Sequence, residues 1–113
     1  METLQCIGAQ EATDLVRYCL GEDGEIIPGK HFRDELMAEG LSFEDAWGVL
    51  RTGQVYEPPV QDIRTREWKY RLEGYEPGGR WIVIVLAFKS LERTFLITVF
   101  SVKTRKRRSH EKN

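Results

Sequence analysis

The spacing of apolar residues divides the chain into a helical half and a strand-like half. Before Gly53, apolar residues recur every three or four positions, which is the spacing of an amphipathic helix. This pattern predicts helices at about residues 9–20 and 30–39, and a third between an N-cap at Ser42 and a stop at Gly53. Between the first two helices, the short apolar pair at residues 26–27 predicts an extended piece.

After Gly53 the spacing of apolar residues changes to two, which is the spacing of strands. Strands are predicted at about 54–57, 67–75, 80–88 and 93–102. The last three are joined by short turns, and only antiparallel neighbours can be joined so briefly. The strand at 80–88 is apolar on both faces, so we expect it to be central and covered on both sides. The sequence therefore predicts an α+β fold in which N-terminal helices pack on an antiparallel β-meander.

The length of 113 residues suits one domain, which we expect to cover residues 1–103. The last part of the chain, residues 104–113, is basic and polar and predicts a disordered tail. No apolar stretch approaches the length of a membrane helix, and the N-terminus lacks the basic start of a signal peptide. We therefore expect a cytoplasmic protein with no membrane partner. Cys6 and Cys19 lie among apolar residues and are expected to be buried free thiols.

The net charge of −1 hides a strong asymmetry along the chain. Residues 1–62 contain 4 Lys or Arg against 13 Asp or Glu, whereas residues 63–113 contain 13 against 5. This polarity favours either an anion-binding face in the second half or contact with an acidic partner. A mixed, solvated surface is the simpler alternative.

His31, at the start of the second predicted helix, is the first candidate for chemistry. An imidazole titrates near neutrality, so it can take a proton from a ribose 2′-hydroxyl or give one to a leaving 5′-oxygen. Arg33 lies two residues further on, and Glu35 lies one helical turn away. The alternative is a structural histidine that is hydrogen-bonded to the backbone or to Glu35.

The second candidate is the charged face of the strand at 67–75, where Lys69, Arg71 and Glu73 alternate with apolar residues. The two cations would hold a scissile phosphate beside one acid or base. Arg80 lies near in sequence and extends the basic patch, and the hydroxyl of Thr98 on the last strand would donate to a phosphate oxygen. An ordinary solvent-facing strand surface is the alternative.

Other side chains could also contact RNA, and the absence of several motifs excludes some reaction classes. Trp and Tyr side chains can stack on bases, and the five cations within residues 103–108 can contact phosphates without sequence preference. The two His residues are far apart, and neither has a Cys at ligand spacing. Phosphate-binding loops, nucleophile elbows and paired metal carboxylates are absent from the sequence, so it predicts no metal and no cofactor.

Taken in order, several short motifs resemble the DUF4258 family. They are His31-x-Arg33, the segment Gly40-Leu41-Ser42-Phe43-Glu44-Asp45, the strand Lys69-Tyr70-Arg71-Leu72-Glu73-Gly74 and the closing Leu96-Ile97-Thr98-Val99-Phe100. The resemblance covers about residues 28–102. It implies a relationship to the RelE- and BrnT-type toxins, small ribonucleases with helices packed on an antiparallel sheet. A toxin of this kind would have RNA as its substrate and an antitoxin protein as its partner.

Two hypotheses follow from the sequence. The first is a metal-independent endoribonuclease of toxin type, with His31, Lys69, Arg71 and Thr98 as catalytic residues, and with Arg33, Glu73 and Arg80 binding the substrate. The second is a non-catalytic module that binds protein or RNA through the same sheet face. RNA cleavage that survives a chelator distinguishes the first hypothesis from the second.

Overall fold

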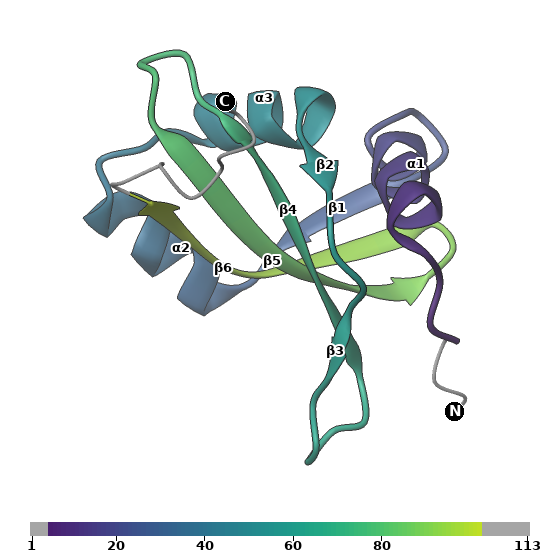
Figure 1. The fold of residues 1–113 in the computed structure, drawn as a ribbon. Coiled ribbons are helices and arrows are strands. Elements are labelled where there is room, and N and C mark those ends of the chain that lie inside the picture. Colours follow the sequence, from purple (N-terminus) through teal and green to yellow (C-terminus); the bar gives the residue numbers. More distant parts are fainter. Residues whose placement is uncertain (1–4, 103–113) are drawn as a thin grey trace, which may run out of the picture.

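A computed structural model describes residues 5–102, which form three helices and a six-stranded sheet (Figure 1). The predicted disordered tail at 104–113 lies outside the described residues. In chain order the elements are α1 (Ala9–Cys19), β1 (Glu25–Pro28), α2 (Lys30–Ala38), α3 (Phe43–Thr52), β2 (Gln54–Val55), β3 (Val60–Gln61), β4 (Trp68–Tyr75), β5 (Trp81–Ser90) and β6 (Arg93–Val102). The α+β prediction is confirmed.

The sheet has the strand order β1-β6-β5-β4-β2, and β3 pairs with β4 outside this path. Strands β4, β5 and β6 are antiparallel neighbours, so the predicted meander is confirmed. Strand β1 pairs with β6 in parallel, with Ile27 opposite Phe95. The sheet is therefore mixed, because the extended piece predicted at residues 26–27 joins the edge of the meander.

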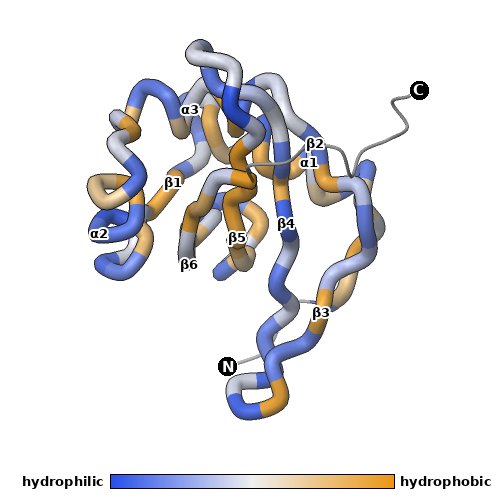
Figure 2. Tube along the Cα trace, turned by 60° about the vertical axis from the view of Figure 1, so that its left-hand side comes forward, coloured by the Kyte–Doolittle hydropathy of each residue, from blue (hydrophilic) through white to orange (hydrophobic). Residues whose placement is uncertain are grey.

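The three helices contribute their buried residues to one core, on one face of the sheet. The chief contacts join α2 to β6, α3 to β4, and α1 to β2. The largest fully buried side chains of this core are Val16, Phe32, Val49, Leu50, Tyr70, Leu72, Ile82, Ile84, Leu86, Leu96 and Val99. Figure 2 shows the hydrophobic residues concentrated along β5, the middle strand of the meander. We call this side of the sheet the helical face, and the other side the open face.

Strand β4 alternates between these two faces as predicted. Tyr70 and Leu72 point into the core, so Arg71 and Glu73 lie on the open face. Strand β5 is buried on both faces, but helices cover only one of them. On the open face Val83 is buried in a layer of long side chains from the neighbouring strands. The Arg71 guanidinium, for example, lies 5.9 Å from the centre of the Phe100 ring.

Local chemistry determines where two of the helices begin. The Ser42 hydroxyl accepts a hydrogen bond from the Asp45 amide, and the Asp45 carboxylate accepts one from the Ser42 amide, both at 3.0 Å. These reciprocal bonds form a capping box at Ser42, the N-cap that the sequence predicted. Helix α2 begins after Gly29, which leaves no room for a side chain because a Cβ there would lie 2.6 Å from the Phe95 ring. The start of α2 is thus pressed against β6.

Strand β3 and the beginning of β4 form a two-stranded arm that projects from the body of the protein (Figures 1 and 2). Asp62 holds its turn together by accepting hydrogen bonds from the amides of Arg64 and Thr65 and by an ion pair with Lys69. The hydrogen bond from Lys69 is the main reason that the pKa of Asp62 lies well below its usual range. At the tip, Ile63 is 91% exposed.

The two cysteines differ in their burial. Cys19 is a buried free thiol as predicted, and burial raises its pKa. Cys6 is exposed, so the prediction of burial was wrong for it. It precedes α1, where its apolar neighbour Ile7 is itself only partly buried. Among the described helices, none is long and apolar enough to cross a membrane.

The attachment of α2 to the sheet is testable with two variants of one helix. Phe32 is fully buried, so Phe32→Ala is expected to lower the free energy of unfolding by about 3–5 kcal/mol. Met37 on the same helix is 75% exposed, and Met37→Ala is expected to change it by no more than about 0.5 kcal/mol. Denaturant unfolding measures both values. Equal losses would show that α2 is not anchored through Phe32.

Candidate nucleic-acid interface

The open face brings together two of the predicted site residues in one cross-strand row. Arg71 on β4 is opposite Val85 on β5, and Val85 is opposite Thr98 on β6. Adjacent strands lie about 4.8 Å apart, so the Cα atoms of Arg71 and Thr98 are about 10 Å apart. Both side chains lie on the same face because they share a row. A phosphate that lies above Val85 would therefore be within reach of a guanidinium and a hydroxyl.

Arg71 is the more accessible of the two cations on the open face of β4. Its side chain is 50% exposed and leans across β5 toward the Phe100 ring on β6. The Nε atom lies 3.7 Å from Oε2 of Glu73, which is too long for a good hydrogen bond. The guanidinium is half exposed and makes only this long contact with Glu73, so it is accessible to an incoming anion.

Glu73 lies one row further along the open face and is mostly buried, with 8% of its surface exposed. Its Oε1 atom accepts a hydrogen bond of 2.9 Å from the indole Nε1–H of Trp81. The carboxylate is thus held in a defined position beside Arg71. The structure thus places a guanidinium and a carboxylate side by side on the strand face that the sequence analysis singled out.

Lys69 is on the same side of β4, but its ammonium group is already paired. It forms an ion pair of 2.8 Å with Asp62 at the turn of the arm. Its side chain is 34% exposed, compared with 50% for Arg71. Lys69 therefore stabilises the turn of the arm through Asp62, and an RNA phosphate would have to compete with Asp62 for its ammonium group.

Arg80 connects the β4–β5 turn to the C-terminal end of α2. Its Nε donates to Glu76 Oε2 at 3.1 Å, and its NH1 donates to the Glu39 carbonyl at 3.0 Å. Glu76 also accepts hydrogen bonds from the amides of Gly78 and Arg80. These bonds, chiefly that from Gly78, lower the pKa of Glu76. Arg80 thus lies at one end of the open face, away from the row of Arg71.

His31 and Arg33 lie on α2, in the helical layer, and both are exposed. Within residues 5–102 neither side chain forms a hydrogen bond or an ion pair, including with Glu35. Helix α2 buries Phe32 against the helical face, whereas Arg71, Glu73 and Thr98 are on the open face. The structure therefore brings Arg71, Glu73 and Thr98 together and places His31 in a different layer.

An aromatic group lies at the end of the open face, and the sequence analysis did not predict that its rings meet. The Tyr75 and Trp81 rings meet edge to face with centroids 4.7 Å apart, and Tyr56 lies 6.2 Å from Trp81. Tyr56 is 51% exposed and Tyr75 is 58% exposed. The sequence does indicate this contact, because Tyr75 and Trp81 flank the predicted turn and must be cross-strand neighbours.

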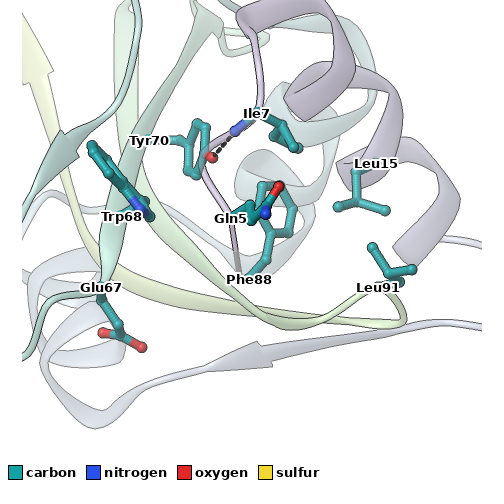
Figure 3. Close-up of a pocket in the computed structure, with 8 residues that line it drawn as sticks. All are labelled: Gln5, Ile7, Leu15, Glu67, Trp68, Tyr70, Phe88 and Leu91. Carbon is teal, nitrogen blue, oxygen red and sulfur yellow. Dashed lines mark hydrogen bonds between the residues drawn. The ribbon is translucent and has the colours of Figure 1, made fainter. Parts of the chain in front are cut away.

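The helical side of the sheet holds a separate apolar pocket of about 150 Å³ (Figure 3). Its lining includes Ile7, Leu15, Trp68, Phe88 and Leu91. The hydroxyl of Tyr70 at its edge accepts a hydrogen bond from the Ile7 amide at 3.0 Å, and burial raises the pKa of this tyrosine. The pocket contains none of the predicted site residues.

Among the described residues, no group of His, Cys, Asp or Glu is arranged to hold a metal ion. The candidate interface therefore consists of an open sheet face with one accessible arginine, one positioned carboxylate, one hydroxyl and an aromatic end. These are groups for binding a phosphate backbone and flat rings.

Fold and interface together define a small α+β protein with three helices on one face of a mixed sheet and a polar, aromatic open face. The chain belongs to the family described as a domain of unknown function, DUF4258, whose model matches residues 29–101. The matched segment runs from the start of α2 to the end of β6 and so includes the whole open face of the meander. No curated protein and no solved structure was found to match the chain.

The role of Glu76 in the turn predicts a pH-dependent stability. Its folded-state pKa lies below the ordinary value of 4.5, so its stabilising effect is present above that value and is lost as the pH falls through the lowered pKa. Glu76→Gln is therefore expected to lower Tm at about pH 7, and the difference from the parent chain should shrink below about pH 4. Thermal melts at both pH values measure this. A difference that grows in acid would contradict the assignment.

Proposed function

We propose that this protein is a metal-independent endoribonuclease of toxin type that holds RNA on the open face of its sheet. The observation that carries the proposal is the row of Arg71 and Thr98, with the Glu73 carboxylate one row away. A cation, a hydroxyl donor and a proton acceptor on one surface are the groups that phosphodiester cleavage without a metal requires. Membership of a family of unknown function neither supports nor opposes this activity.

The chemistry would proceed by attack of a ribose 2′-oxygen on the adjacent phosphorus. The bond from phosphorus to the 5′-oxygen breaks, and a 2′,3′-cyclic phosphate forms. In this scheme Glu73 would accept the proton of the 2′-hydroxyl, and the leaving 5′-oxygen would take a proton from water. Arg71 and Thr98 would stabilise the negative charge that develops on the phosphate oxygens. His31 has no role in this scheme because its helix lies in the other layer.

The second candidate function is a non-catalytic module that binds RNA through the same face. One observation favours it: Glu73 is mostly buried and already accepts a hydrogen bond from Trp81. In this reading the Glu73 carboxylate holds the Trp81 indole in place and accepts no proton. The open face would then bind phosphates through Arg71 and bases through Tyr56 and Tyr75 without cleavage.

Cleavage of a labelled single-stranded RNA in excess chelator tests the proposal. The parent chain is expected to produce 2′,3′-cyclic phosphate ends, and Arg71→Ala to lower the rate about 10²-fold, as expected when a charge-stabilising group is removed. Arg51→Ala is the matched control, because Arg51 is an exposed arginine at the end of α3 in the helical layer. Intact RNA with shifted mobility would favour the binding module instead.

The same assay decides which group transfers the proton. Glu73→Gln should lower cleavage about 10²-fold or more while RNA is still bound, because the amide keeps the shape but cannot accept the proton. Parent-like cleavage by His31→Ala would agree with this assignment. A 10²-fold loss in His31→Ala, at unchanged Tm, would return the proton transfer to the histidine that the sequence analysis favoured.

The basic residues after β6 are expected to add affinity without specificity. A chain that ends at Lys103 loses Arg105, Lys106, Arg107 and Arg108, so it should bind RNA more weakly at low salt and with a smaller dependence on salt concentration. Binding isotherms at several salt concentrations measure both effects. An unchanged salt dependence would show that these cations do not contact RNA.

As part of the toxin proposal, the protein partner would be an antitoxin that covers the open face.

A further inference from the structure

A polar cavity lies at the end of the sheet, where the β4–β5 turn, the last residues of β6 and the end of α2 meet and the open face adjoins the helical layer. Its volume is about 390 Å³, and its lining includes Glu39, Tyr75, Arg80, Trp81 and Ser101. This volume lies within the range of about 300–1,000 Å³ that is common for small-molecule sites. The cavity is distinct from the row of Arg71, which lies two rows further along the same sheet.

The aromatic wall of the cavity suits a flat ring. Tyr75 and Trp81 are directly opposite each other on β4 and β5, and their rings meet at 79°. Tyr75 remains 58% exposed, so much of its ring is accessible to a ligand. A nucleobase stacks favourably on such a ring, and every base has a π-face that can stack. The wall therefore indicates a base but does not select one.

The polar wall contains both a donor and an acceptor in fixed positions. The Glu39 carboxylate accepts a hydrogen bond of 2.8 Å from the Ser101 hydroxyl, and its Oε1 atom lies 3.9 Å from Arg80 NH1. Arg80 is itself held by Glu76 and by the Glu39 carbonyl. A base that binds here meets a carboxylate and a guanidinium side by side. Guanine matches this arrangement, because it presents N–H donors on one edge and the acceptors O6 and N7 on another. The other bases fit less well, since adenine lacks the O6 acceptor and the pyrimidines present a smaller ring for stacking.

We propose that this cavity is a subsite for a guanine base of single-stranded RNA, with Tyr75 stacking on the base and Glu39 and Arg80 selecting it. This inference rests on the proposed function in one respect: if the protein cleaves RNA at Arg71, the subsite gives the cleavage a preference for a nearby guanosine. Binding of the base itself requires no cleavage and can be measured separately.

The test is a titration of the full chain with the 3′-monophosphates of guanosine, adenosine, cytidine and uridine. Calorimetry or amide chemical shifts measure the binding. The guanosine nucleotide is expected to bind about tenfold more tightly than the others, which corresponds to one bidentate contact to a base. Tyr75→Ala should weaken binding of all four nucleotides. Glu39→Gln should retain binding but remove the preference for guanine. Tyr18→Ala is the control, because Tyr18 is an exposed tyrosine on α1.

Equal affinity for the four nucleotides, or no binding of any of them, would overturn the subsite. So would a guanine preference that survives Glu39→Gln in a variant with the parent Tm. The outcomes for the two proposals are separable. Guanine-selective binding without RNA cleavage supports the subsite and rejects the ribonuclease, whereas chelator-resistant cleavage together with equal affinity for the four nucleotides supports the ribonuclease and rejects the subsite.

Discussion

The burial of three helices against a single face of the sheet is the constraint on which the rest of the structure depends. Phe32 from α2, Leu50 from α3 and Val16 from α1 meet in one core above the middle strands. Burial of such side chains contributes about 1.5–3 kcal/mol each, which makes this contact the main source of stability. Because side chains alternate along a strand, the residues between the core positions must point to the other face. The candidate interface is therefore a direct consequence of the core.

The charge of the open face is weaker than the sequence alone indicates. Most cations of the second half that the structure describes take part in ion pairs, and several of the partners are acids of the first half. Arg93 pairs with Glu25, Arg80 with Glu39 and Lys69 with Asp62. Many of these cations are therefore already neutralised by a nearby carboxylate. Chain folding thus pairs much of the charge asymmetry of the sequence within the protein.

The elements with a clear local signal could be predicted from the sequence, and those that depend on distant pairing could not. The capping residues Ser42 and Asp45 mark α3, and the alternation around Tyr70 and Leu72 marks β4 and both of its faces. By contrast, β1 has four residues and becomes a strand only because β6 accepts it in parallel, more than sixty residues later in the chain. The two-residue strands of the arm likewise depend on pairing with β4.

The candidate site shows the same division. Arg71 and Glu73 share a face because they are two residues apart on one strand, which the sequence reveals. The meeting of Arg71 with Thr98 depends on the register of two strand pairs, and the sequence does not specify that register. The position of His31 likewise could not be predicted, because a residue near a helix start carries no information about which layer its helix joins. Phe32, its neighbour, anchors α2 on the helical face and so separates His31 from Arg71.

The central claim is that RNA binds the open face, and the three tryptophan indoles provide a direct measurement of it. Trp81 lies on the open face and donates to Glu73, Trp47 lies on α3, and Trp68 lines the apolar pocket. In a titration with single-stranded RNA followed by ¹H–¹⁵N NMR, the indole Nε1–H signal of Trp81 is expected to shift while those of Trp47 and Trp68 stay unchanged. Shifts at Trp47 with an unchanged Trp81 signal would place RNA on the helical layer and contradict the account.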